Sequence, residues 1–487
     1  MKILKDILYK VNIDSVIGST DISINKIEFH SLKIHKNDLF VAVSGNILDG
    51  NQFILQAIKK GAKVILCEIL PEIIIKNITY VKVKDIRESL SLICANYYGN
   101  PSKKLKLVGI TGTNGKTTTA NLMFQLFGLF DFKVGLISTN KIIIGNKKIE
   151  SKLTTPDPLT LNKVLFQMVE SNIQFCFMEV SSHSIQQKRI YGLYFKVGVF
   201  TNLSHDHLDY HKTFSEYRDV KKIFFDSLND SSFAIVNTDD KNGNYIIQNS
   251  KAKVYRYALK SKADFSLKIF EKDFNGMKMS INGSEIWTKL IGEFNAYNIL
   301  ATYSLAKILG FNEDKLLNNI SALNTVEGRF EKVISDGVNK IGIVDYAHSP
   351  DSIQKILQTL NELKKNNESI ITVIGCGGDR DINKRPLMGG IAASLSDKVV
   401  FTSDNPRFED PKIIIEQIKS GVDKNDLHKV TSFIDRKKAI QFACEINGRN
   451  DVILVAGKGH EKFQIKGNSK IEFDDKKVLQ EFLKNEK

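Results

Sequence analysis

An apolar run, a glycine-rich turn and a second apolar run follow one another in residues 105–130. The first run, Leu105–Ile110, predicts a buried β-strand, and the second, Thr119–Phe130, has the amphipathic spacing of an α-helix. A strand that enters a helix through glycines is typical of α/β proteins with parallel sheets. In such proteins ligands bind at the carboxyl ends of the strands, so this turn is the first candidate site.

The turn reads Gly-Thr-Asn-Gly-Lys-Thr-Thr. Gly112 and Gly115 allow backbone N–H groups to approach an anion, and the dipole at the start of the helix attracts negative charge. Lys116 offers a point charge for phosphate groups, and the hydroxyl of Thr117 can ligate Mg²⁺. Ile110 stands where the usual motif has its first glycine, so a chance turn is the alternative to a nucleotide cradle.

The chain has 487 residues, more than a single hydrophobic core holds, so several domains are expected. Hydrophobic residues make up 42% and charged residues 25%, which excludes a mainly disordered or fibrous protein. No apolar run approaches the ~20 residues of a membrane span. The five cysteines are scattered and form no Cys-x-x-Cys pair, so we expect a cytoplasmic location rather than a disulfide framework or a zinc ribbon.

The pattern of runs divides the chain into three predicted domains. Residues 1–103 mix β-like and helical runs and end at a Gly-Asn-Pro-Ser turn. Residues 104–325 alternate strands with helices, which predicts a parallel sheet. Residues 326–487 contain β-branched runs that each open into a polar loop, namely Ile341–Asp345, Ile370–Ile374, Lys398–Thr402 and Val452–Val455.

A formal net charge of +14 is compatible with a polyanionic partner such as nucleic acid. Lysine is abundant along the whole chain, however, and no arginine-rich block or basic stripe interleaved with aromatic residues stands out. We interpret the excess as a diffuse compositional bias and expect no nucleic-acid partner.

Two polar segments follow predicted strands in the middle of the chain. Glu179 lies near the end of the run Gln174–Val180 and can hold a hydrated Mg²⁺, which prefers one or two carboxylates together with phosphate oxygens. Three histidines and two aspartates crowd into residues 205–211, but their spacing is poor for zinc and no cysteine helps. The better interpretation is a polar loop that contacts an anionic substrate or a metal.

Lys221 lies in the run Tyr217–Lys222, whose apolar face continues into Ile223–Phe225. This spacing predicts a lysine near the boundary of the buried side of a helix. A partly buried lysine has a lowered pKa, whereas one whose ammonium group reaches water along the surface keeps its charge. The residues alone leave both readings open.

In their order these motifs resemble those of the Mur ligase family, the ATP-dependent amide-forming enzymes of peptidoglycan precursor synthesis. The resemblance begins with Gly-Thr-Asn-Gly-Lys-Thr, Glu-Val-Ser-Ser-His, Asn-Leu-x-x-Asp-His-Leu-Asp-Tyr-His and Tyr-x-x-x-Lys. It continues through Gly292–Asn298, Glu327–Phe330, Val344–Pro350, Gly375–Asp381, Asp404–Arg407 and Gly457–Glu461. It therefore covers nearly the whole chain.

The resemblance implies a three-domain α/β fold. A smaller α/β N-terminal domain would bind the uridine nucleotide, and a central domain with a P-loop-type, mostly parallel sheet would bind ATP. A Rossmann-like C-terminal domain would bring the amino acid. The implied reaction activates UDP-N-acetylmuramoyl-L-alanyl-D-glutamate as an acyl phosphate and joins it to meso-2,6-diaminopimelate. Mg²⁺, and CO₂ for the carbamylation of a lysine, are the implied cofactors, and we expect a monomer without a membrane partner.

The resemblance also implies roles for individual residues. ATP contacts fall on Gly112, Thr113, Asn114, Gly115, Lys116, Thr117, Thr118, Asn298, Arg329 and Asp345. Muramoyl-dipeptide contacts fall on Ser31, Thr154, Thr155, Ser181, Gln187 and Arg189, and diaminopimelate contacts on Arg380, Asp404, Asn405, Pro406, Arg407, Gly457 and Glu461. The implied metal ligands are Thr117, Glu179, His207 and Lys221, the last as its carbamate. The implied catalytic residues are Lys116, Lys221, His207 and Arg329, and Arg329 is expected to reach the phosphates when the C-terminal domain closes.

Other functions remain open from the sequence. The same chemistry could use L-lysine, which lacks one carboxylate of diaminopimelate, although the planar fork of Arg407 suits that carboxylate. Folylpolyglutamate synthetase shares the ATP chemistry but lacks a UDP-binding N-terminal domain of this type. A basic nucleic-acid ATPase would use the cradle and the charge and leave the C-terminal loops without a role.

Overall fold

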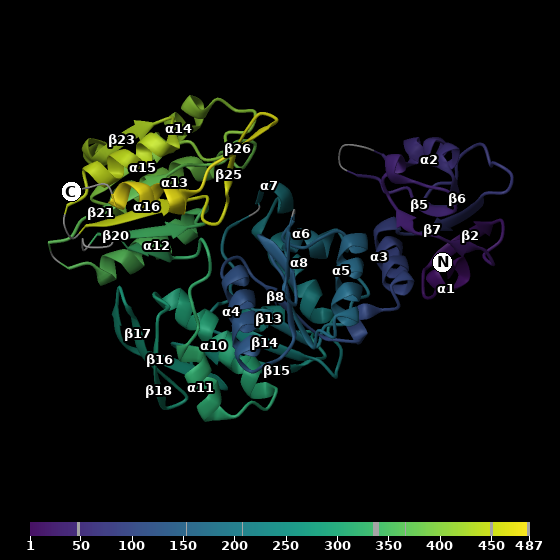
Figure 1. Cartoon of the computed structure of the whole chain (residues 1–487), viewed down its shortest axis with the longest axis horizontal. Coiled ribbons are helices and arrows are strands. Elements are labelled where there is room, and N and C mark those ends of the chain that lie inside the picture. Colours follow the sequence, from purple (N-terminus) through teal and green to yellow (C-terminus); the bar gives the residue numbers. More distant parts are fainter. Residues whose placement is uncertain are drawn as a thin grey trace.

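The computed structural model describes residues 1–45, 49–151, 153–206, 208–334, 340–365, 367–448 and 451–484, with the backbone alone at residues 208 and 209. These residues form a three-domain α/β fold in which each domain has its own sheet and hydrophobic core (Figure 1). The N-terminal and C-terminal domains lie toward opposite ends of the long axis, with the central domain between them. The predicted fold class is therefore confirmed, whereas the boundaries at residues 103 and 325 stay a prediction.

The N-terminal domain is built on a sheet of order β2-β7-β6-β5-β4. Its elements are β1 (Lys2–Ile3), α1 (Leu4–Ile7), β2 (Ile13–Ile17), β3 (Ser23–Ile24), β4 (Ile27–Glu28), β5 (Asp38–Val41), α2 (Ile54–Lys60), β6 (Ala62–Cys67), β7 (Thr79–Val83) and α3 (Ile86–Tyr97). The strands from β4 to β7 are parallel, and β2 pairs antiparallel with β7. Val64 and Val81 of the sheet pack with Leu90 and Ile93 of α3, so this helix closes one side of the core.

The central sheet has the order β11-β10-β9-β12-β8-β13-β14-β15-β16-β17-β18 among the described residues. Its strands are β8 (Lys106–Thr111), β9 (Val134–Ile137), β10 (Lys141–Ile144), β11 (Lys147–Glu150), β12 (Phe175–Glu179), β13 (Val197–Phe200), β14 (Phe233–Asn237), β15 (Lys253–Ala258), β16 (Phe265–Asp273), β17 (Gly276–Ile281) and β18 (Ser284–Thr288). The strands from β9 to β16 in this order are parallel. Antiparallel pairs extend the sheet at both edges, a feature that strand–helix alternation does not predict.

Helices cover both faces of the central sheet. They are α4 (Lys116–Leu129), α5 (Pro158–Glu170), α6 (Ser182–Gln186), α7 (Leu208–His211), α8 (Phe214–Asp226), α9 (Gly243–Ile246), α10 (Glu293–Ile308) and α11 (Glu313–Ser321). The predicted amphipathic character of the helix after the glycine-rich turn is wrong, because α4 packs on β9 and β12 of the sheet and also against α10 beside it, and is buried over most of its surface. It also begins at Lys116, before the predicted start.

The C-terminal domain has a sheet of order β19-β20-β24-β21-β22-β23 with helices on both faces. The strands of this sheet are β19 (Glu331–Ile334), β20 (Ile341–Asp345), β21 (Ile370–Ile374), β22 (Lys398–Thr402), β23 (Val430–Phe433) and β24 (Val452–Ala456). β25 (Phe463–Lys466) and β26 (Ser469–Glu472) form a separate antiparallel pair. The helices of the domain are α12 (Pro350–Leu363), α13 (Lys384–Leu395), α14 (Pro411–Lys419), α15 (Arg436–Glu445) and α16 (Asp475–Lys484). All strands of this sheet except β19 are parallel, which is the Rossmann-like arrangement that was expected.

The central and C-terminal domains touch near the carboxyl ends of their parallel strands. Asp351 in the first turn of α12 accepts hydrogen bonds from Asn114 Nδ2 at 2.7 Å and from Ser204 Oγ at 3.0 Å. Lys384 at the start of α13 forms an ion pair with Asp206 at 2.5 Å. These contacts bring two sets of strand-end loops together. No helix within the described part of the chain is long and apolar enough to cross a membrane.

Candidate active site

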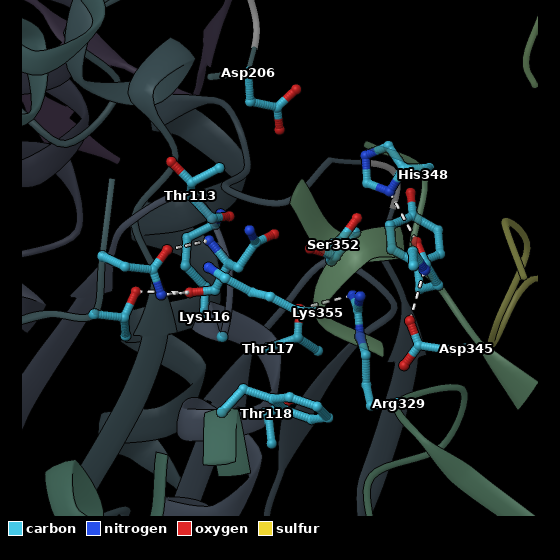
Figure 2. A pocket seen from close by; sticks show the side chains of 18 of the residues that line it. Thr113, Lys116, Thr117, Thr118, Asp206, Arg329, Asp345, His348, Ser352 and Lys355 are labelled. Atoms are coloured by element: carbon cyan, nitrogen blue, oxygen red, sulfur yellow. Dashed lines mark hydrogen bonds between the residues drawn. The ribbon is translucent and has the colours of Figure 1, made fainter. Parts of the chain in front are cut away.

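A cavity of about 910 Å³ lies between the central and C-terminal domains. Figure 2 shows Lys116 and Thr117 on one side of it and Arg329 and Asp345 on the other. Most residues predicted from the sequence line it: Thr113, Asn114, Gly115, Lys116, Thr117, Thr118, Thr154, Glu179, Ser181, Arg189, Lys221, Asn298, Arg329, Asp345, Arg380, Asp404, Asn405, Arg407, Gly457 and Glu461. Residues far apart in the chain therefore meet at one site.

The other predicted residues lie elsewhere. Gly112, Thr155 and Gln187 stand behind the lining and bond to residues that face the cavity. Pro406 links the lining residues Asn405 and Arg407. Ser31 lies in the N-terminal domain, where its hydroxyl donates to Gln56 Oε1 at 2.6 Å. His207 falls outside the described residues.

The glycine-rich turn forms a tight cradle at the start of α4. Gly112 and Gly115 have positive φ angles of 149° and 85°. A Cβ atom at Gly112 would lie 2.0 Å from Thr201 Oγ1, and one at Gly115 would lie 2.6 Å from Asn298 Oδ1. Both glycines are therefore required by backbone conformation and by close packing. The role of this turn as a phosphate cradle stays a prediction.

Lys116 folds back over this turn. Its Nζ donates to the carbonyl oxygens of Gly112 at 2.9 Å and Thr113 at 2.7 Å. Burial lowers the pKa of Lys116, and the negative charge of Glu179 opposes that shift. The ammonium group is thus held beside the helix N-terminus, where an anion would be attracted by both.

Glu179 at the end of β12 is fully buried and tightly held. Its carboxylate accepts hydrogen bonds from Thr117 Oγ1 at 3.0 Å and from the backbone N–H of Thr139 at 2.8 Å. Arg329 Nη2 donates to the same Thr117 hydroxyl at 3.1 Å. A hydroxyl and a carboxylate in contact beside a phosphate cradle are the ligand types that Mg²⁺ accepts. Arg329 reaches the cradle in this arrangement of the domains.

Lys221 is buried, with 1% of its surface exposed, so it does not reach water along the surface. Its Nζ donates to the carbonyl oxygen of Gly112 at 2.9 Å. Burial, and then the positive charge of Lys116, lower the pKa of Lys221 well below its ordinary value, although Asp206 acts in the opposite direction. The neutral amine is thereby favoured. The neighbouring Lys222 is instead paired with Asp226 at 2.7 Å.

Asn298 and Asp345 approach the cavity from the central and C-terminal domains respectively. Asn298 Oδ1 accepts from Thr119 Oγ1 at 3.1 Å. The carboxylate of Asp345 accepts from the backbone N–H groups of Phe330 and Ala347, both at 2.6 Å. Burial raises the pKa of Asp345 to about 6, although the charge of Arg329 lowers it. Both side chains are thus fixed by neighbours before any ligand arrives.

The C-terminal end of the cavity is formed by loops after β21, β22 and β24. Asn405 Nδ2 donates to Glu461 Oε2 at 2.8 Å, and buried Lys458 donates to the same oxygen at 2.7 Å and to Asn405 Oδ1 at 3.1 Å. Arg407 Nη1 donates to the carbonyl oxygen of Gly378. The loops are therefore cross-linked to one another through side chains.

A third group of polar residues lies near the carboxyl end of β12. Arg189 donates to Gln187 Oε1 through Nε at 3.0 Å and to the Thr155 carbonyl through Nη1 at 2.8 Å. Thr154 accepts from Thr139 Oγ1 at 3.2 Å, and Ser181 caps α6. Five of the six residues assigned to the muramoyl dipeptide thus cluster together, and Ser31 is the exception.

The histidine-rich segment does not form a metal cluster in the part that the structure describes. His211 Nε2 lies 2.9 Å from Ser182 Oγ, and Asp206 pairs with Lys384. No group of three His, Cys, Asp or Glu side chains suited to a metal occurs among the described residues.

Sequence reasoning missed four residues that shape the cavity. Lys458 lies within a quoted motif, and Lys384 follows another, so their positions gave a signal. Asp351 directly follows a third quoted motif, Val344–Pro350, whereas nothing in the local sequence of Thr139 indicates its contact with Glu179. Such contacts arise from pairing over long sequence separation.

Two parallel sheets that face each other across a cavity, one of them carrying a phosphate cradle, define a nucleotide-binding α/β protein of several domains. Three family models match the chain: "Mur ligase family, catalytic domain" at residues 23–98, "Mur ligase middle domain" at 110–306 and "Mur ligase, glutamate ligase domain" at 328–459. The chain belongs to the Mur ligase family.

Individual relatives are similar along their whole length. UDP-N-acetylmuramoyl-L-alanyl-D-glutamate–2,6-diaminopimelate ligase of Cytophaga hutchinsonii is 49% identical over 99% of this chain and 99% of its own. The protein of the same name from Phocaeicola vulgatus is 47% identical over 99% and 100%. A solved structure of a ligase with that name has a TM-score of 0.70 at 28% identity and covers 99% of this chain and 98% of its own.

Proposed function

We propose that this protein is an ATP-dependent ligase that adds meso-2,6-diaminopimelate to UDP-N-acetylmuramoyl-L-alanyl-D-glutamate in peptidoglycan precursor synthesis. Relatives named for this reaction are 49% and 47% identical over 99% of the chain. One structural observation carries the proposal. A single cavity is lined both by the phosphate cradle around Lys116 and by the Asp404–Arg407 loop. Activation and amide formation can thus take place without release of the intermediate.

The nucleotide is proposed to lie along the cradle. Backbone N–H groups at the start of α4 and the ammonium of Lys116 would contact the β- and γ-phosphates. The Lys116 ammonium has to leave the carbonyl oxygens of Gly112 and Thr113 to do so, which is a short movement of one flexible side chain. Arg329, already within 3.1 Å of Thr117 Oγ1, would add a second positive charge.

Mg²⁺ is proposed to be held by Thr117, Glu179, His207 and carbamylated Lys221, and when bound it neutralises phosphate charge. The donor set supports this, because the Thr117 hydroxyl touches the buried carboxylate of Glu179. Formation of a carbamate needs a neutral amine, and the burial of Lys221 lowers its pKa in the direction that favours one. The nitrogen of that amine would bond to the carbon of CO₂ and lose one proton.

The reaction on the substrates follows from these positions. The D-glutamyl carboxylate of the UDP-linked dipeptide attacks the γ-phosphorus of ATP, and ADP leaves. The amine of diaminopimelate attacks the carbonyl carbon of the acyl phosphate, the tetrahedral intermediate expels phosphate, and one proton departs. Arg189, Thr154 and Ser181 are proposed to hold the dipeptide, so that its carboxylate lies near the cradle.

The end of the cavity formed by the C-terminal loops is proposed to recognise both charged groups at the far end of diaminopimelate, its carboxylate and its ammonium. Arg407 would pair with the distal carboxylate, assisted by Arg380 at the rim of the cavity. Glu461, held by Asn405 and Lys458, would face the distal ammonium. Asp404, Pro406 and Gly457 would shape the pocket.

The uridine part of the substrate is proposed to extend to Ser31 in the N-terminal domain. The monomeric state and the cytoplasmic location stay predictions.

The test is ATP-dependent phosphate release by the purified protein with UDP-N-acetylmuramoyl-L-alanyl-D-glutamate and one amino acid at a time. We expect turnover with meso-diaminopimelate. Turnover with L-lysine instead would replace the amino acid and keep the ligase chemistry. ATP hydrolysis stimulated by nucleic acid, with binding that weakens steeply with salt, would support the nucleic-acid ATPase instead.

A further inference from the structure

A fully buried ion pair lies beneath the amino-acid end of the cavity. Arg436, the first residue of α15, meets Asp475, the first residue of α16, and both side chains have 0% exposure. Nε donates to Asp475 Oδ1 at 2.7 Å and Nη2 donates to Oδ2 at 2.8 Å, which is the bidentate geometry of a strong pair. Neither residue lines the cavity itself.

The same guanidinium also contacts two strand ends of the sheet. Nη2 donates to the carbonyl oxygen of Ala456 at 2.9 Å, and Nη1 donates more weakly to that of Ser403 at 3.4 Å. Ala456 directly precedes Gly457, and Ser403 directly precedes Asp404. One side chain therefore joins the carboxyl ends of β24 and β22, from which two of the pocket loops depart.

The two loops are in contact beyond these strand ends. A Cβ atom at Gly457 would lie 2.7 Å from Asp404 Oδ2, so the loops pack closely. Asn405 and Glu461 are then bridged by Lys458. A shift of either strand end would therefore displace Asn405, Arg407 and Glu461.

Stability alone does not account for this arrangement. Burying two charges has a large desolvation cost, and apolar side chains of similar volume often stabilise a core as well or better. An apolar replacement could not hold two carbonyl oxygens and a carboxylate in fixed directions. The planar fork of arginine does so, whereas a lysine would offer a single nitrogen to four acceptor oxygens.

We propose that Arg436, held by Asp475, is a positioning residue that sets the relative placement of the Asp404–Arg407 and Gly457–Glu461 loops and thereby the binding and selection of the amino-acid substrate. The inference rests on the proposed function, because it assumes that the amino acid binds between these loops. Arg436 acts through the loops and does not touch the substrate.

The experiment compares Arg436→Met, Arg436→Lys and Asp475→Asn in the full-length protein. The matched control is the pair Lys437–Glu481, which joins the same two helices at 3.0 Å with 49% and 48% exposure. We expect Arg436→Met to raise KM for diaminopimelate by about 10-fold or more, because small displacements of positioning groups have large kinetic effects. KM for ATP should change by less than about twofold, since the cradle belongs to the central domain and the carboxylate of Asp345 is held by Phe330 and Ala347 rather than by Arg436. Arg436→Lys should resemble Arg436→Met, and Asp475→Asn should show a smaller shift in the same direction.

The control variants Lys437→Met and Glu481→Gln should leave both KM values unchanged. Suppose that the unmodified protein turns over diaminopimelate, and that the folded Arg436 and Asp475 variants have the same KM for diaminopimelate and the same preference for it over lysine. The positioning role is then refuted, and the proposed function stands. A lowered melting temperature with unchanged KM would likewise refute it, because that is the signature of a purely structural pair. If Arg436→Met does not fold, Asp475→Asn decides, since it keeps the size of the side chain. If the unmodified protein has no activity with diaminopimelate, the proposed function fails and this inference fails with it.

Discussion

The proposed nucleotide end and the proposed amino-acid end of the cavity are built in different ways. At the nucleotide end, one contiguous run from Thr113 to Thr118 supplies the glycine, the lysine and the hydroxyls. At the amino-acid end, three loops after β21, β22 and β24 each contribute one or a few residues. The first is shaped by local backbone geometry, and the second by buried side chains such as Lys458 and Arg436 that join separate loops.

This difference predicts how each end responds to substitution. In a cradle built from one contiguous run, substituting a residue should remove the contacts of that residue and leave those of its neighbours unchanged. In a site assembled from separate loops, residues that never touch the substrate should influence selectivity. Four substitutions test this contrast, from the largest expected effect to the smallest.

Replacing Lys116 should have the largest effect, because its ammonium is the cation held at the cradle. We expect Lys116→Ala to lower kcat/KM by about 10⁴-fold through loss of phosphate stabilisation. The circular dichroism spectrum should not change. Lys163→Ala, at an exposed position of α5, is the control and should keep full activity. Near-normal turnover by Lys116→Ala would remove the cradle from the mechanism.

Lys221→Ala should lower activity by about 10³-fold, since a buried amine with a lowered pKa would be lost. A short-chain carboxylic acid in solution should restore part of the activity by replacing the oxygens of the proposed carbamate. Lys222→Ala is the matched control one residue away, and it should remain active because Lys222 is paired with Asp226. If Lys222 proves essential and Lys221 dispensable, the carbamate has been assigned to the wrong lysine.

Arg407 should control the choice of amino acid. We expect kcat/KM for L-lysine to be at least ~10³-fold below that for diaminopimelate, or about 4 kcal/mol, because an analogue without the carboxylate would leave the guanidinium of Arg407 without its partner in the bound complex. Arg407→Ala should reduce this preference to below about 10-fold. Lys412→Ala, an exposed charge in the next helix, should leave it intact. Equal turnover of both amino acids by the unmodified protein would contradict the assignment.

Asp345 should affect stability in a pH-dependent way. Its pKa of about 6 in the folded chain lies above the ordinary value of 3.8, so the folded state binds more protons than the unfolded state between these values. Its stabilising contribution is therefore complete below about pH 4 and is lost as the pH rises through about 6, a change of about 3 kcal/mol.

The measurement is the difference in unfolding free energy between the unmodified protein and Asp345→Asn from pH 4 to 7, which should fall as the pH rises. Asp397→Asn is the comparison for which the difference in unfolding free energy should change with pH in the opposite direction. Burial opposes the shift there, yet hydrogen bonds from Ile370 and Lys364 lower the pKa of Asp397, so its contribution should be lost as the pH falls. A flat difference for Asp345→Asn would show that its carboxyl group is not perturbed.

The positions of strands in the parallel sheets were predicted closely, whereas the antiparallel edge strands and the burial of α4 were not. The runs Ile341–Asp345, Ile370–Ile374 and Lys398–Thr402 coincide with β20, β21 and β22, because short apolar runs that are buried on both faces have a strong local pattern. The antiparallel edge strands were missed, because the central region was interpreted as an alternation of strands and helices, which leads to parallel pairs. The character of α4 was misjudged because its burial depends on α10, more than 150 residues further along the chain.

Within the site, the sequence alone determines the parts that depend on neighbouring residues. The conformation of the glycine-rich turn and the identities of Lys116, Thr117 and Glu179 follow from local steric limits and from the chemistry of single side chains. The tertiary structure alone decides the burial of Lys221, the contact of Arg329 with Thr117 and the junction formed by Arg436. Those features require that segments distant in the chain pack together, and desolvation and hydrogen-bond direction are defined only after they have done so.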